Sequence, residues 1–354
     1  MQTLTRRELT VALAARQLLT ERRRIAPAEA IRVLTPLQGQ DSRAPFVALA
    51  ARLDGFTRAD LEAAIVARDV VKTTIMRLTL HVAAAADYPA YAQLARQARL
   101  RNWRATYPQL DAQEVTAELR AWLAEPRTND EIRARVRDYD GVTAEPWTAV
   151  IFARTLLPLV QLPPAGFWDD KRRPQFVVDP RPLPEPADAA ATVVARYLAA
   201  FGPASRRDLA AWAGVAQRDF APAWERLETV SYRDEQGAEL LDLPGRPLPP
   251  AKTRLPVRFL ARWEQPLLAY ADRERIIPSE LLPLRLTLSG YQTVTVDGRV
   301  AASWRLERGR RTLRVVVEPH VEIRRAAHAG IRAEAKRTAR FCEPDGRAVE
   351  VAGV

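Results

Sequence analysis

Apolar residues recur at helical spacing over the first part of the chain. Leu9, Ala12 and Leu19 fall near one stripe, which predicts a helix over residues 5–19. The same reasoning predicts further helices, at residues 26–34, at 43–53 with Asp41 or Ser42 as the cap, and at 57–69 with Thr57 as the cap. Residues 70–84 are rich in β-branched side chains and predict a two-stranded ribbon. Helices followed by such a ribbon are typical of a winged-helix module.

A second copy of this pattern follows. Residues 127–139 predict a helix that is capped near Thr128 or Asn129. Residues 144–162 predict a longer helix that runs into a strand. Residues 163–180 then have a polar tip, DDKRR, between two apolar arms, and this arrangement predicts a wing.

A third copy covers residues 191–230. It contains a helix, a Gly-Pro break, a short helix capped by Ser205, a turn at Gly214 and a last helix from residue 216. A short turn with glycine between two helices is a helix-turn-helix signal, although many such pairs bind no DNA. Trp212 and Trp224 are expected to be core residues of this module.

From about residue 240 the pattern becomes that of a sheet. Apolar and polar residues alternate over 289–319, and Asp297-Gly298 is a strong signal for a type I′ hairpin turn. Residues 330–342 predict a helix that packs on this sheet. The expected fold is mainly α with β, with tandem winged-helix modules before a C-terminal β-rich, barrel-like domain. The expected boundaries are 1–110, 111–185, 186–238 and 239–354.

Composition narrows the function further. The net charge is +11 with a pI near 10.3, and almost all the cationic residues are arginine. A GC-rich genome explains the arginine preference but not the positive excess, which favours a nucleic-acid partner. One cysteine and three histidines argue against a disulfide or a metal site. The absence of a phosphate-binding loop argues against a nucleotide cofactor. With no signal peptide or membrane span in the sequence, we expect a cytoplasmic bacterial protein, associated with the nucleoid when bound to DNA.

The stretch LTPLQGQDSRAPF contains two glutamines one residue apart, Gln38 and Gln40. Pro36 and Gly39 favour an extended backbone, in which both side chains would point to one side. A glutamine side chain is neither an acid nor a nucleophile, but it offers an acceptor and two donors that can hold a water molecule. The spacing alone favours loop residues that satisfy backbone groups.

Five segments together resemble one family. They are LQGQDSRAPFVALAARLDGF, IMRLTLHV with DYPAY, RYLAAFGPASRRDLAAWAGV, PLLAYADRERIIP and VDGRVAASWRLERGR, and they extend from about residue 5 to 345. They resemble the AlkZ-like winged-helix DNA glycosylases, the azinomycin-resistance type. The resemblance implies tandem winged helices around a basic channel and excision of N7-alkylated purines, including bulky adducts or interstrand crosslinks in some members.

The resemblance also implies a catalytic Gln-x-Gln motif, which Gln38 and Gln40 match. Gly39 departs from it, because the family more often has an aliphatic residue between the glutamines. No lysine is near the pair in sequence, Lys72 being the nearest, which favours a monofunctional glycosylase over a lyase. The expected partner is double-stranded DNA containing alkylated purines, bound by a monomer without a cofactor. The alternative is a non-catalytic winged-helix DNA-binding protein or regulator.

Other residues are candidates for DNA contact. Arg77, Thr79 and His81 alternate in the first ribbon and would share a face, as contacts near the glutamines or as a solvated strand surface. At the predicted wing tip the candidates are Phe167 or Trp168, followed by Lys171, Arg172 and Arg173. The same tip also fits an ordinary polar turn with a buried tryptophan. Asp41 is a helix cap or a catalytic base, and the capping role is favoured.

Overall fold

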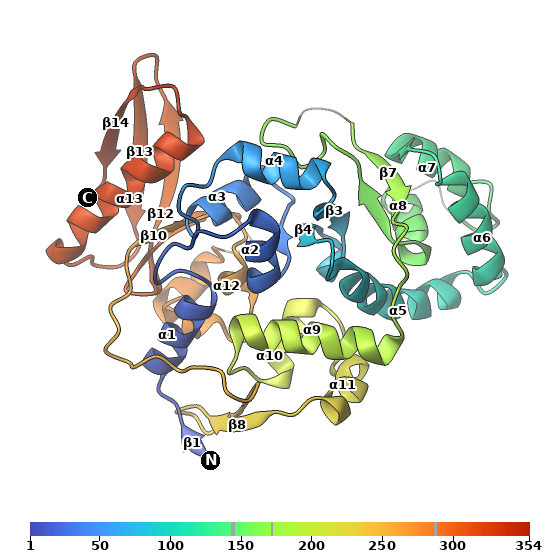
Figure 1. Cartoon of the computed structure of the whole chain (residues 1–354), viewed down its shortest axis with the longest axis horizontal. Helices are drawn as coiled ribbons and strands as arrows, with labels where there is room; N and C mark the ends of the chain where they lie inside the picture. Colours follow the sequence, from blue (N-terminus) through green and yellow to red (C-terminus); the bar gives the residue numbers. More distant parts are fainter. Residues whose placement is uncertain (143–145, 171–172, 287–288) are drawn as a thin grey trace.

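The computed structural model describes residues 1–142, 146–170, 173–286 and 289–354. Within these ranges the chain forms a mixed assembly of helices and three sheets (Figure 1). The C-terminal sheet and its helix lie at the left of the view, and the N-terminus lies at the bottom beside the small sheet.

The first part of the chain is helical and ends in a two-stranded ribbon, as predicted. Thr57 and Asp60 form a capping box at the fourth helix, which confirms the predicted cap. The elements are β1 (Gln2–Thr3), α1 (Arg6–Arg16), α2 (Pro27–Leu34), β2 (Leu37–Gln38), α3 (Ala44–Ala50), α4 (Arg58–Val66), β3 (Val70–Thr74) and β4 (Leu80–Ala84).

The second part begins with two helices that the sequence pattern did not predict, α5 and α6. The predicted helix at 127–139 is confirmed, and Thr128 caps it in a capping box with Glu131. The predicted helix that runs into a strand is also confirmed, as α8 and β6. The elements are α5 (Tyr88–Thr106), α6 (Ala112–Trp122), β5 (Arg127–Thr128), α7 (Asn129–Val136), α8 (Pro146–Leu156), β6 (Leu159–Gln161) and β7 (Gln175–Val178).

The third part follows the predicted order of helix, break, helix, turn and helix. Ser205 caps the short helix, and Gly214 ends it in the left-handed conformation with φ 70. The elements are α9 (Pro186–Phe201), α10 (Arg206–Ala213), α11 (Ala221–Arg226), β8 (Val230–Arg233) and β9 (Glu239–Asp242).

The C-terminal part is a meander of strands covered by a helix. Asp297 and Gly298, with φ of 49 and 84, make the predicted turn between its second and third strands. The elements are β10 (Arg258–Leu260), α12 (Gln265–Leu268), β11 (Gln292–Val296), β12 (Arg299–Arg308), β13 (Thr312–Pro319), α13 (Arg325–Cys342) and β14 (Ala348–Ala352). Short 3-10 turns lie at Met76–Leu78, Gln217–Phe220, Arg273–Arg275 and Ser279–Leu284.

This C-terminal sheet is open, so the prediction of a barrel-like domain is not confirmed. Its strand order is β10-β11-β12-β13-β14, and in the described part of the chain the two outer strands do not pair with each other. Helix α13 packs its apolar side, including Ile331 and Ala335, against the same core as Val315 and Val317. The helix therefore buries the apolar sheet face that closure into a barrel would otherwise cover.

One six-stranded sheet joins two of the predicted modules. Its order is β2-β4-β3-β6-β7-β5, so the first ribbon pairs with the second through β3 and β6. Strand β1 pairs in parallel with β8, which ties the N-terminus to the third module. The predicted boundary between residues 110 and 111 is thus bridged by strand pairing, and the boundaries themselves stay predictions.

Two large cores lie on opposite faces of the six-stranded sheet. Along the first ribbon, Val71 and Ala83 belong to one core, while Val70, Val82 and Ala84 belong to the other. This division follows from the alternation of side chains along a strand. The sheet is therefore the element that holds the two halves of the molecule together.

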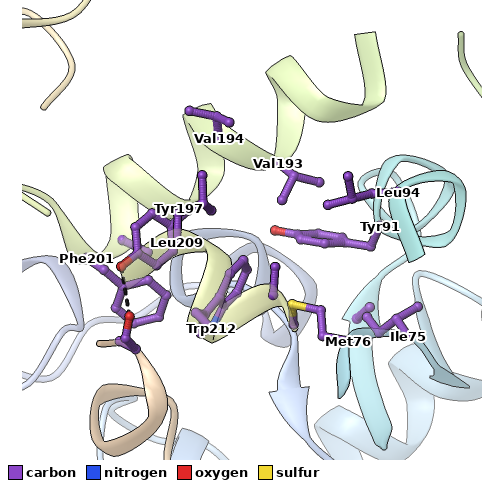
Figure 2. Close-up of a cluster of buried hydrophobic side chains, with 14 of the residues drawn as sticks. Ile75, Met76, Tyr91, Leu94, Val193, Val194, Tyr197, Phe201, Leu209 and Trp212 are labelled. Atoms are coloured by element: carbon purple, nitrogen blue, oxygen red, sulfur yellow. Dashed lines mark hydrogen bonds between the residues drawn. The ribbon is translucent and has the colours of Figure 1, made fainter. Parts of the chain in front are cut away.

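The first of these cores is built around an aromatic cluster between α5, α9 and α10 (Figure 2). Trp212 is fully buried and packs against Tyr91, Tyr197 and Phe201. This confirms the prediction that Trp212 is a core residue, and Trp224 packs partly buried against the same cluster. The cluster fixes α10 against the ribbon that carries the candidate site.

Candidate active site

The segment that carries the glutamines is extended at Gln38, as predicted, but it bends at Gln40. Strand β2 pairs antiparallel with β4, and Gln38 lies opposite His81. The pairing continues past the strand, because the Gly39 amide donates to the carbonyl oxygen of Leu80 at 2.8 Å. The glutamines therefore lie on the edge of the six-stranded sheet, next to the beginning of β4.

Gln38 is held at both ends of its carboxamide. Its Nε2 donates to Oγ1 of Thr79 at 3.1 Å, and its Oε1 accepts from the Gly39 amide at 3.1 Å. The residue is 8% exposed. Each of these contacts uses one of the amide's hydrogen-bonding positions, so a second N–H and a second lone pair remain.

Gln40 is exposed and reaches the same part of β4. Its Oε1 accepts from the Leu80 amide at 3.4 Å. The Nε2 group makes no hydrogen bond within the described residues, so both of its protons are available to a ligand. The two side chains thus converge on residues 79–80, one largely buried and one open to solvent.

Gly39 has a steric reason to be glycine. A Cβ atom at this position would lie 3.3 Å from Cγ2 of Val82 and 3.4 Å from the carbonyl carbon of His81. Contacts this short require the neighbouring strand to yield by a few tenths of an ångström. Gly39, where the family motif more often has an aliphatic residue, therefore lies at a point where β2 comes close to β4.

The turn before β4 places Thr79 beside Gln38. Thr79 donates through Oγ1 to the carbonyl oxygen of Met76 at 3.2 Å, which leaves its oxygen as an acceptor for Gln38. The turn is tight, because Arg77 and Leu78 have φ of 51 and 57. The hydroxyl therefore connects the glutamine to the backbone of the turn.

Arg77 lies in this turn and not in a strand, so the expected alternation with His81 on one ribbon face is wrong. Its guanidinium donates to the carbonyl oxygen of Trp212, near the end of α10. Gly214 packs directly against it, because a Cβ there would lie 2.7 Å from Cγ of Arg77. The structure thus assigns Arg77 a contact between the turn and α10, and a role toward DNA stays a prediction.

His81 is fully buried, which excludes both the solvated strand face and an exposed contact in this arrangement. Burial, with a further contribution from Arg77, lowers the pKa of His81 to about 3. The neutral ring therefore carries its proton on Nδ1, which lies 2.9 Å from the carbonyl oxygen of Thr79. Its Nε2 has no hydrogen-bond partner among the described residues. His81 supports the same turn as Gln38, and its predicted contact with DNA is untested.

Asp41 behaves as a turn residue. Its Oδ1 accepts from the Arg43 amide at 3.0 Å, and its carbonyl oxygen accepts from the Ala44 amide at 3.2 Å. Its other carboxylate oxygen lies 3.8 Å from Nε of Arg262. The N-cap residue of α3 is Arg43, which has no side-chain cap, so the predicted cap at Asp41 or Ser42 is wrong. Asp41 instead binds the turn that precedes the helix.

The predicted wing corresponds to the segment between β6 and β7, but Trp168 is not exposed at its tip. Trp168 is 4% exposed and packs edge-on against Phe46, with the guanidinium of Arg58 3.9 Å above its ring. This corrects the expectation of a tryptophan near the DNA and matches the alternative of a buried tryptophan. Arg173 is highly exposed and pairs with Asp130 at 2.7 Å.

Lys171 and Arg172 lie outside the described residues. Among the residues that are described, no group of three or more His, Cys, Asp or Glu side chains is arranged to hold a metal ion. In the same ranges, no helix is both long and apolar enough to cross a membrane.

Lys72 is nearer to Gln38 in space than the sequence shows, but it is on the other face of the sheet. It lies opposite Val82, and Val82 lies opposite Leu37, whereas Gln38 lies opposite His81. Neighbouring residues of a strand point to opposite faces. Lys72 is also buried, and burial lowers its pKa.

Comparison with known proteins identifies the family of the chain. A family model of AlkZ-like DNA glycosylases matches residues 31–341, a range that includes both glutamines and the turn at residues 75–79. The chain therefore belongs to the AlkZ-like DNA glycosylase family, and DNA is the partner that this membership implies.

A solved structure shows the same fold. The Streptomyces sahachiroi DNA glycosylase AlkZ matches with a TM-score of 0.80 and 21% identity, over 99% of this chain and 100% of that one. No curated protein sequence matches the chain.

Proposed function

We propose that this protein is a monofunctional DNA glycosylase that excises N7-alkylated purines from double-stranded DNA by directing water to C1′. It acts as a monomer and without a cofactor. The observation that carries the proposal is the convergence of the Gln38 and Gln40 carboxamides on residues 79–80. A pair of neutral side chains in this position suits a reaction that needs a placed water molecule and no strong acid.

The chemistry of the substrate explains why neutral side chains suffice. An N7-alkylated purine carries a positive charge on its ring, so the base departs without being protonated by the enzyme. The remaining tasks are to stabilise the positive sugar and to hold water at C1′. A carboxamide can accept from water and donate to it, and it avoids the cost of burying a carboxylate beside phosphates.

The position of Lys72 supports hydrolysis over a lyase step. A lyase needs an amine that lies in the substrate site and can attack C1′. Lys72 belongs to the opposite face of the sheet from Gln38 and is buried there. A water nucleophile held by the glutamines is therefore the mechanism that fits this arrangement.

The arrangement of helices and ribbons supports DNA binding through tandem winged helices. The second part has α6, α7 and α8 before the β6–β7 ribbon, and the third has α9, α10 and α11 before the β8–β9 ribbon. Three helices followed by a ribbon are the order of a winged helix. The net charge of +11 supplies the attraction to phosphates.

The test is excision of 7-methylguanine from a labelled duplex. The protein should leave an abasic site, so strand cleavage should appear only after treatment with base. Borohydride should trap no covalent protein–DNA adduct, and an excess of chelator should leave the rate unchanged. If the wild-type protein binds the duplex but releases no base from methyl, bulky or crosslinked N7 adducts, the non-catalytic DNA-binding alternative replaces this proposal.

A further inference from the structure

Three arginines from two helices line one small hollow beside the candidate site. Arg96 and Arg99 of α5 and Arg154 of α8 surround it together with Thr74 and Tyr88. Its volume is about 10 Å³, which is space for roughly one water-sized group. We call these three side chains and the space between them the arginine hollow. Helices α5 and α8 pack together in the right half of the view (Figure 1).

The sequence places these side chains together through helical periodicity. Tyr88, Ala92, Arg96 and Arg99 fall on one stripe of α5. Arg154 lies in the last turn of α8, the helix that packs across that stripe. No local signal in the sequence connects residue 154 with residues 96 and 99, so the cluster is a product of the tertiary fold.

Within the described residues, none of the three arginines is paired with a carboxylate, unlike Arg16 and Arg52, which are buried elsewhere in the molecule. Arg16 pairs with Asp242 at 2.6 Å, and Arg52 pairs with Glu264 at 2.9 Å. Buried charges are normally neutralised in this way. The arginine hollow is therefore an uncompensated cluster of positive charge.

The electrostatics of the hollow reflect this lack of compensation. Burial lowers the pKa of Arg99 to about 10, with Arg154 lowering it further, and burial lowers the pKa of Arg154 to about 10. Burial, followed by repulsion from Arg104 and Arg120, also lowers the pKa of Arg96. An anion placed in the hollow would reduce the repulsion and offset the cost of burying the positive charges.

Part of the charge has a structural role. Arg96 donates through Nε to the carbonyl oxygen of Leu156 at 3.1 Å, and Arg99 donates through Nη1 to that of Arg154 at 3.4 Å. These are carbonyls at the end of α8, where the helix carries about half a negative charge. Half a charge does not balance three guanidinium groups. Arg154 donates through Nη2 to Oδ1 of Asn129 at 3.2 Å, and its guanidinium lies 4.7 Å over the ring of Phe176. Each of the three guanidinium groups still keeps at least one N–H without a hydrogen bond among the described residues.

The hollow and the glutamine pair share one turn. Arg99 donates through Nη2 to the carbonyl oxygen of Ile75 at 2.5 Å, and the Ile75 amide donates to the carbonyl oxygen of Thr79 at 3.3 Å. Thr79 in turn accepts from Gln38. A ligand at the arginines is thus separated from Gln38 by the turn at residues 75–79.

We propose that Arg96, Arg99 and Arg154 form a phosphodiester-binding site that holds the DNA backbone next to the Gln38–Thr79 contact. The identity of the ligand rests on the proposed glycosylase function, because a DNA enzyme brings phosphodiesters to this surface. The small hollow has room for one non-bridging oxygen, so the rest of the phosphodiester lies outside it. Bidentate recognition of phosphate oxygens is a property of arginine that lysine lacks.

The experiment compares salt dependence of DNA affinity in four full-length proteins. They are the wild type, Arg154→Gln, Arg154→Lys and the control Arg305→Gln. The control removes the same formal charge from an exposed guanidinium that Glu307 and Glu318 already neutralise. Affinity for an undamaged duplex is measured by fluorescence anisotropy from low to moderate salt. Because no excision occurs, the result is independent of whether the protein is a glycosylase.

Loss of one phosphate contact should reduce the slope of log affinity against log salt by about 1 in Arg154→Gln, and the control should keep the wild-type slope. Arg154→Lys should keep most of the slope but bind more weakly. Equal slopes in Arg154→Gln and the wild type would overturn the proposal. A second result would also overturn it. In this result millimolar inorganic phosphate raises the melting temperature of the wild type but not of Arg154→Gln, while both proteins have the same DNA slope. The site would then hold a free anion and not the DNA backbone. Circular dichroism checks that each variant is folded, and Arg96→Gln replaces Arg154→Gln if the latter is not.

Discussion

The carboxamide of Gln38 donates from Nε2 to Oγ1 of Thr79 at 3.1 Å, and Oγ1 of Thr79 in turn donates to the carbonyl oxygen of Met76. This chain of two hydrogen bonds fixes which end of the amide faces the turn. The free N–H and lone pair of Gln38 therefore have defined directions before any substrate binds. Preorganised polar groups of this kind contribute most to catalysis when their supporting contacts are intact.

Replacing Thr79 with valine should slow excision without weakening DNA binding. The substitution removes the acceptor for Gln38, and a neutral hydrogen bond contributes about 0.5–1.5 kcal/mol, so the single-turnover rate should fall roughly twofold to tenfold. Thr79→Ser keeps the hydroxyl and is the matched control. In a Gln38→Ala background, Thr79→Val should not slow excision further, because Thr79 acts through the carboxamide of Gln38. An equal loss in both backgrounds would show that Thr79 acts independently of Gln38.

Gln38→Ala and Gln40→Ala should each reduce the excision rate strongly. Losing a well-placed polar contact at a transition state costs roughly 2.7–4 kcal/mol, or about a hundredfold to a thousandfold. Because the glycosidic bond to a cationic base is already weak, we expect a loss in rate nearer to a hundredfold. DNA affinity should hardly change, because neutral amides contribute nothing to the salt-dependent term. A double alanine variant as fast as the wild type in single turnover would refute this assignment of the site.

The buried His81 should make the free energy of unfolding depend on pH. Its folded pKa of about 3 lies below the value of about 6.5 for an unfolded histidine, so the unfolded chain binds one more proton between these values. His81 therefore contributes stability above pH 6.5 that is lost as the pH falls toward 3, at up to about 1.4 kcal/mol per pH unit. Urea unfolding of wild type and His81→Asn from pH 7 to 4 should show a shallower slope in the variant. Parallel slopes would mean that His81 is not buried as a neutral ring.

Gly214→Ala should destabilise the protein more than the matched change Gly55→Ala. Both glycines have φ near +70, so each alanine costs roughly 1–2 kcal/mol for the left-handed conformation alone. Only at Gly214 would the new Cβ meet another group, Cγ of Arg77 at 2.7 Å, whereas nothing lies within 4 Å at Gly55. Denaturant unfolding measures the difference, and equal losses would show that Arg77 moves away freely.

The alternation and periodicity of the sequence were enough to predict the local elements. Helix caps such as Thr57 and Ser205 and the turn at Asp297-Gly298 depend on residues next to one another, so local chemistry determines them. The extended backbone at Gln38 follows equally from its neighbours Pro36 and Gly39. The family resemblance added the expected activity, which these patterns alone do not specify.

The tertiary structure decided how the elements pack. The pairing of β3 with β6 joins two modules that the sequence separates, and α13 covers a sheet that was expected to close. Trp168 is buried against Phe46. The sequence could not show this, because a tryptophan beside a polar stretch has the same local pattern whether it faces solvent or a distant core. Burial depends on partners far along the chain, which a local pattern cannot identify.

The same distinction holds within the candidate site. The sequence by itself determined that Gln38 occupies an extended segment, because backbone geometry there depends on adjacent residues. Only the tertiary structure brought Thr79 to Gln38, turned Arg77 toward Trp212 and gathered Arg96, Arg99 and Arg154 around one hollow. Such contacts join residues that are tens of positions apart. Their formation depends on how helices and strands pack, which is settled by the burial of the whole apolar core and not by any local stretch of the chain.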